Sequence, residues 1–147
     1  MIIGADIKTN TWLDLIESGG YKDSLLSIYK NEPPKITAFD LIGFSDLLRN
    51  NSITMSLLTK DVPATAAQFW GGANVTGVRV ELRLMGIEFY TSNFWYSPDE
   101  ATDTRRMKHV TEHISEPGKK RTVIMDGAFT AMAATISIIG VSPTIGR

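Results

Sequence analysis

The feature that most constrains the fold is the run from Val78 to Leu84, in which apolar and charged side chains alternate strictly. The apolar members are Val78, Val80, Leu82 and Leu84, and the charged members are Arg79, Glu81 and Arg83. Successive side chains of a strand point to opposite faces, so this pattern predicts a strand with one face in the core and the other in water. Strands of this kind are typical of antiparallel sheets. The chain is therefore expected to build an antiparallel sheet.

The segment after this strand changes phase, because the apolar residues move from even positions to the odd positions Ile87 and Phe89. A change of phase by one residue beside Gly86 indicates a bulge or a tight turn, followed by a second strand that continues towards Trp95. This alternation places Phe89 in the core. A further strand is predicted from Ser52 to Thr59.

Three segments carry helical patterns. Residues 12–16 form a short amphipathic pattern that ends at Gly19-Gly20, and residues 21–30 form a second one that must end before Pro33-Pro34. The almost wholly apolar run from Gly127 to Ile139 follows Asp126, a residue suited to capping a helix, and stops at Gly140. It is too short to span a bilayer as a helix, so we expect it to be a core helix.

Length and composition indicate one packed domain. The chain has 147 residues, 43% of them hydrophobic and 21% charged, which suits a single core without disorder. It has no cysteine, so stability must come from burial rather than from disulfides or thiolate metal sites. The expected fold class is α+β, with residues 1–147 forming one domain in which an antiparallel sheet packs with short N-terminal helices and an apolar C-terminal helix.

The segment HVTEH, from His109 to His113, has the H-x-x-E-H spacing of inverted zinc metalloproteases. On a helix the two histidines would share one face, with Glu112 beside them. A catalytic zinc site needs a third protein ligand, and the acids that follow His113 are only Glu116, which precedes a proline, and Asp126, the expected helix cap. We therefore expect no metal site, no catalytic residue and no cofactor, and keep a zinc hydrolase as the third alternative. The preferred interpretation of this segment is a solvated, weakly helical face.

Charge is unevenly distributed along the chain. The formal net charge is -1, but basic residues outnumber acidic ones after residue 100. Most of the excess lies in two short runs, consisting of Arg105, Arg106 and Lys108 and then Lys119, Lys120 and Arg121. These six residues are the predicted binding site for an anionic membrane or RNA. The competing interpretation is that they only solvate the surface or pair with neighbouring glutamates.

Aromatic residues supply a second set of candidate contacts. They cluster just before the first basic run, where aromatic side chains beside cations can stack on bases or insert at a membrane interface. The candidates are Tyr90 and Phe94 from this cluster and Trp70 from the loop before Gly71-Gly72. For Trp70 the favoured interpretation is a side chain folded back onto the core.

The order of these segments resembles the small matrix proteins of negative-strand RNA viruses. The features that carry the resemblance are a helical N-terminal part, the strands TGVRVELRL and IEFYTSNFWY, a basic connector and an apolar helix ending IIGVSPTIG. The closing GVSP is similar to bornavirus matrix proteins, and ITAFDLIGFSDL followed by GVRVELRL resembles the rhabdovirus matrix core. The chain lacks the PPxY and PTAP peptides and the long basic N-terminal arm of rhabdovirus matrix proteins. The resemblance therefore does not imply budding through such peptides.

The resemblance implies a non-enzymatic viral structural protein that self-assembles and bridges an anionic membrane surface and a ribonucleoprotein. Its expected partners are copies of itself, an anionic lipid surface and RNA or nucleoprotein, with no small-molecule substrate. Its expected location is the virion and the host cytoplasm, peripheral to the inner face of a membrane, without secretion by a signal peptide. The alternative is a nucleic-acid-binding or phage-type assembly module that uses the same basic residues.

Overall fold

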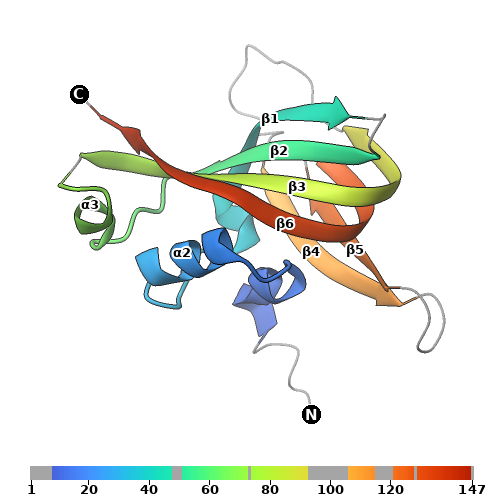
Figure 1. Cartoon of the computed structure of the whole chain (residues 1–147), viewed down its shortest axis with the longest axis horizontal. Helices are drawn as coiled ribbons and strands as arrows, with labels where there is room; N and C mark the ends of the chain where they lie inside the picture. Colours follow the sequence, from blue (N-terminus) through green and yellow to red (C-terminus); the bar gives the residue numbers. More distant parts are fainter. Residues whose placement is uncertain are drawn as a thin grey trace.

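The structure, a computed structural model, describes residues 8–47, 51–72, 74–92, 106–114, 121–127 and 129–146. Figure 1 shows a curled sheet with short helices packed beneath it. The strands are β1 (Phe39–Leu47), β2 (Ser52–Thr59), β3 (Val75–Ser92), β4 (Met107–Ile114), β5 (Arg121–Gly127) and β6 (Phe129–Ile145). The helical segments are η1 (Lys8–Leu15), α2 (Gly20–Ile28), η2 (Ile36–Ala38) and α3 (Ala66–Phe69).

The sheet consists of two antiparallel meanders joined by its two longest strands. Its order is β1-β2-β3-β6-β5-β4, and every pair is antiparallel. β3 and β6 pair along almost their whole length, from Val75 opposite Ile145 to Ser92 opposite Phe129. The sheet curls into a half-barrel (Figure 1). Its two edges approach each other at an isolated bridge between Asp40 of β1 and Arg106, the residue before β4.

One face of the sheet forms the core, as the alternation predicts. Val78, Val80, Leu82 and Leu84 are fully buried, whereas Arg79 and Arg83 are exposed on the opposite face. The predicted strand from Ser52 to Thr59 is also confirmed, and it buries Ile53, Met55 and Leu57 on the same side as the β3 residues. We call the side that points away from this core the outer face.

The N-terminal segments complete the core. The two predicted helices correspond to the 3-10 helix η1 and to α2, which contribute buried Trp12, Leu13, Leu25 and Ile28 to the same cluster as the strands. A backbone hydrogen bond of 2.8 Å from Glu17 N to Ile136 O ties the segment between them to β6. The helices therefore share one core with the sheet rather than forming a separate layer.

The predicted C-terminal helix is wrong, and with it the α+β class. Residues Gly127 to Ile139 lie at the end of β5 and along β6, so the fold is a mostly antiparallel half-barrel with short helices and a strand at its C-terminal end. Phe129, Ala131 and Ala133 are buried at every second position, which is the strand period. The run looked like a core helix because its outward positions, such as Met132 and Ile139, are also apolar. The expected apolar C-terminal helix was one of the features that carried the resemblance to matrix proteins, and the structure has a strand in its place.

None of the helices in the described part of the chain is long and apolar enough to cross a membrane.

Candidate binding face

The six basic residues divide into described and undescribed positions. Arg106 immediately precedes β4, and its Nε lies 2.6 Å from Asp40 Oδ1 while its guanidinium also donates to Thr37 O at 3.1 Å. Lys108 is exposed on β4, and Arg121 begins β5. Arg105, Lys119 and Lys120 lie outside the described residues. Arg106 thus joins the two edges of the sheet, and Lys108 is exposed.

The pairing of β4 with β5 separates the two basic runs. Met107 pairs with Gly127 at one end of this hairpin, and Ile114 pairs with Arg121 at the other. At about 3.3 Å per residue the two ends are roughly 20 Å apart. The residues in the two runs that the structure describes therefore belong to opposite ends of one hairpin and do not form one compact patch.

The candidate aromatics are more buried than the sequence suggested. Trp70 is half-buried and packs against the core, with its ring 5.2 Å from Phe69 in an edge-on arrangement. Tyr90 is half-buried, and its ring stacks on Phe129 at a centroid distance of 5.6 Å. Phe94 lies outside the described residues.

Phe89 points outward, as the sequence analysis expected of Tyr90. It is 51% exposed, so the prediction that it lies in the core is wrong. The predicted irregularity exists, because Gly86 has a φ of 67° and the β3–β6 register shifts between Ile87 and Phe89, but β3 continues through it as one strand. The extra residue, Glu88, returns the inward side chains to even positions and turns Phe89 outward.

The HVTEH segment lies on a strand, not on a helix. His109 and His113 are four residues apart on β4, which places their Cα atoms about 13 Å apart instead of one helical turn. His109 Nε2 instead lies 3.2 Å from Asp126 Oδ2 on β5. The described residues contain no group of three potential ligands placed to hold a metal ion. The weakly helical interpretation of this segment is also wrong.

Asp126 joins His109 to a third residue on the outer face. Thr130 Oγ1 of β6 donates to Asp126 Oδ1 at 2.8 Å, so the carboxylate lies between the histidine and the threonine. In a nucleophilic triad the imidazole stands between the hydroxyl and the carboxylate. The order here differs, and the arrangement ties three strands together. The prediction that Asp126 caps a helix is wrong.

An apolar row runs beside this polar row. Phe89 of β3 is directly opposite Met132 of β6, and Met132 is directly opposite Ile124 of β5. Phe89 is exposed, and Met132 and Ile124 are half-buried on the outer face. We call these three residues the outer apolar row. The hydropathy pattern identified its residues as core, so only the register shift at Glu88 could have placed Phe89 in it.

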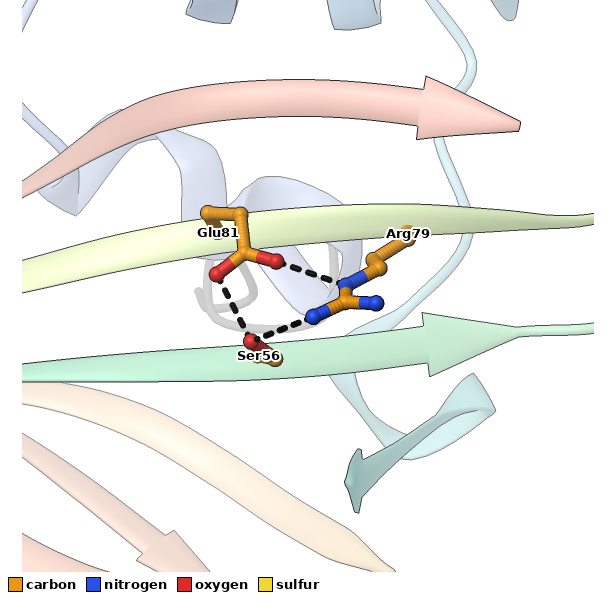
Figure 2. Close-up of polar contacts among 3 residues, drawn as sticks. All are labelled: Ser56, Arg79 and Glu81. Atoms are coloured by element: carbon orange, nitrogen blue, oxygen red, sulfur yellow. Dashed lines mark hydrogen bonds and ion pairs between the residues drawn. The ribbon is translucent and has the colours of Figure 1, made fainter. Parts of the chain in front are cut away.

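A second part of the outer face is polar. Figure 2 shows Arg79 and Glu81 of β3 with Ser56 of β2 in a closed set of contacts. Arg79 Nε lies 2.6 Å from Glu81 Oε2, and Ser56 Oγ donates to Glu81 Oε1 at 2.6 Å. Arg79 also donates to Ser56 Oγ at 3.4 Å. The sequence predicted that Arg79 and Glu81 face water but gave no partner from another strand.

Searches among family models, curated proteins and solved structures found no match to this chain.

Proposed function

We propose that the protein is a non-enzymatic structural protein that associates with copies of itself through the outer apolar row. The observation that carries this proposal is the exposure of Phe89 in register with Met132 and Ile124. Three neighbouring strands present apolar side chains to water at the same level of the sheet. Burial of such a surface against a second copy would remove it from water.

The polar row beside the outer apolar row suits a contact between copies in one defined orientation. His109, Asp126 and Thr130 hold one another through hydrogen bonds or charge and border the apolar row at its edge. Interfaces combine an apolar centre with a polar rim, and the rim adds orientation more than affinity. The two rows together therefore resemble the composition of a binding surface.

A matrix-type role is the narrower form of this proposal. An assembly of copies would repeat the exposed Lys108 and the basic residues at both ends of the β4–β5 hairpin. Each basic side chain near an anionic leaflet contributes about 1 kcal/mol, and repetition strengthens weak contacts through avidity. The partners in this proposal are the inner leaflet of a membrane and a ribonucleoprotein. RNA alone is the alternative partner for the same residues.

Self-association is tested with two phenylalanines of similar exposure. Phe89 is 51% exposed in the outer apolar row, and Phe69 is 48% exposed beside Trp70 on α3. We expect wild type and Phe69→Ser to form oligomers and Phe89→Ser to remain monomeric, as measured by light scattering over a range of concentrations. A wild-type mass of 16.2 kDa at every concentration would contradict the proposal.

The anionic partner is tested with one variant for each end of the hairpin. The first replaces Arg105, Arg106 and Lys108 with serine, and the second replaces Lys119, Lys120 and Arg121 with serine. If both ends contact phosphates, each variant should weaken binding to anionic vesicles and flatten its salt dependence by up to about three units of slope. The same titration with single-stranded RNA distinguishes the lipid partner from the alternative. Unchanged binding to both ligands, with folding preserved in circular dichroism, would remove these residues from the proposed function.

A further inference from the structure

A second row of outward side chains crosses the sheet next to the closed set in Figure 2. Arg83 of β3 is directly opposite Thr54 of β2 on one side and Ser137 of β6 on the other. Their chain neighbours Met55, Leu82 and Ile136 are buried in the core, so the three polar side chains share the outer face. A guanidinium thus lies between two hydroxyls, each on an adjoining strand.

These three groups have no partner within the described part of the chain. Arg83 makes no hydrogen bond or ion pair there, and the hydroxyls of Thr54 and Ser137 make no hydrogen bond there. Two residues earlier in β3, by contrast, Glu81 accepts hydrogen bonds from both Arg79 and Ser56. The closed set is neutral, so Arg83 gives this part of the outer face a net positive charge.

The spacing suits one oxyanion. Side chains directly opposite on antiparallel strands have Cβ atoms about 4.5–5.5 Å apart, so both hydroxyls can reach an anion held by Arg83. A guanidinium binds a carboxylate through two parallel N–H···O bonds. Thr54 and Ser137 would then donate to the same carboxylate from either side.

We propose that the row of Thr54, Arg83 and Ser137 binds an acidic side chain of a protein partner. The charge favours a single carboxylate over a nucleic acid, because this part of the face has one unpaired cation, whereas binding to a chain of phosphates needs several. This site is separate from the outer apolar row and does not depend on self-association.

The experiment measures binding of a glutamate-rich peptide to the full chain and to matched variants. Arg83→Gln removes the guanidinium charge, and Thr54→Val with Ser137→Ala removes both hydroxyls while keeping the charge. Lys60→Gln is the control, because it removes one positive charge from an exposed side chain that follows β2 and belongs to no proposed binding site. Acetate, inorganic phosphate and a single-stranded RNA oligonucleotide are titrated in parallel, and Phe89→Ser shows whether the site works in a chain without the apolar row.

We expect Arg83→Gln to weaken peptide binding on the order of tenfold or more, since the pair is charge-assisted and bidentate. The hydroxyl variant should bind the peptide several-fold more weakly, and Lys60→Gln and Phe89→Ser should bind it as wild type does. Wild-type affinity in Arg83→Gln, or an equal loss in Lys60→Gln, would overturn the proposal. RNA binding that is tighter than peptide binding and equally dependent on Arg83 would overturn the assignment to a protein carboxylate. Unchanged circular dichroism in each variant confirms that folding is not the cause.

Discussion

Tyr29 holds the end of α2 against the segment that follows β2. Its side chain is 7% exposed, and its hydroxyl donates to Asp61 O at 2.6 Å. Thr65 Oγ1 donates to Ile28 O from the next part of the same connection. Burial, and secondarily the charge of Asp61, raise the pKa of Tyr29 well above its ordinary value of 10.0. The phenol therefore stays protonated as a donor in the folded chain.

This raised pKa predicts a loss of stability in alkali. The folded state keeps its proton to higher pH than the unfolded state, whose pKa is near 10.0. The contribution of Tyr29 is therefore fully present below that pH and is lost as pH rises above it. At neutral pH the free energy of unfolding of Tyr29→Phe should be about 1 kcal/mol lower than that of wild type, because the hydrogen bond is missing. Between neutral and alkaline pH, however, the free energy of unfolding should fall less for Tyr29→Phe than for wild type. Urea unfolding at neutral and alkaline pH measures both effects. Tyr21→Phe is the control, because Tyr21 is exposed. Parallel pH profiles of the unfolding free energy for wild type and Tyr29→Phe would contradict the prediction.

Gly86 is required by both conformation and space. Its φ is 67°, and a Cβ built there would lie 2.8 Å from Ala134 Cβ across the β3–β6 pair. We expect Gly86→Ala to lower the free energy of unfolding by about 1–3 kcal/mol. Gly43→Ala is the control, because Gly43 also lies in a strand and a Cβ there meets nothing within 4 Å. Equal unfolding midpoints for the two variants would show that the bulge tolerates a side chain.

At the scale of elements, β6 shows how far hydropathy determines structure. The alternation in β3 specifies both strand and facing, because every second residue is charged. β6 has few polar residues to mark its outer face, and strand and core helix then have the same apolar composition. Its β-branched residues Thr130, Thr135 and Ile136 favour a strand, but this preference is weak beside a capping pattern at both ends. The pairing with β3 decides the outcome, and one sequence does not reveal it.

The contact between the two sheet edges, which we call the seam, also depends on long-range pairing that local sequence does not encode. β1 and β4 touch at one bridge, where the side chains of Asp40 and Arg106 are 35% and 48% exposed. Water screens such an ion pair, so we expect Arg106→Ser alone to lower the unfolding free energy by no more than about 1 kcal/mol. A double-mutant cycle with Asp40→Asn, measured by urea unfolding, should give a coupling of about 0.2–1 kcal/mol. A loss of several kcal/mol would mean that the seam is a structural joint of the half-barrel.

For the whole molecule, the core residues of β2, of β3 up to Leu84 and of the N-terminal helices were predictable, and the arrangement of the strands was not. The strands from Ser52 and Val78 and both N-terminal helices follow from local patterns. The strand order, the position of Asp126 beside His109, and the row formed by Thr54, Arg83 and Ser137 follow from long-range register. Side chains far apart in sequence meet only through that register, so the polar contacts of the outer face could not be predicted.

Trp12 tests whether helices and sheet unfold together. Its indole N–H donates to Pro34 O at 3.0 Å, and its ring meets Phe39 of β1 edge-on at 5.6 Å. Trp12→Ala should cost about 3–5 kcal/mol, because it opens a cavity between the N-terminal segment and the sheet. Circular dichroism and hydrogen exchange of β3 amides should report one shared transition at the lowered stability. Exchange in β3 that stays as slow as in wild type would show that the sheet is stable without the helices.

The long pairing of β3 with β6 has a consequence for the order of events during synthesis. Thr76 and Thr144, which share a hydrogen bond at one end of this pair, are 68 residues apart in the chain. A nascent chain that ends before β6 has β3 without its main partner and with apolar side chains that nothing covers. Distant pairings of this kind form slowly, so the emerging chain passes through an interval in which it is prone to aggregate. Chaperone dependence during translation is therefore expected to end when β6 leaves the ribosome.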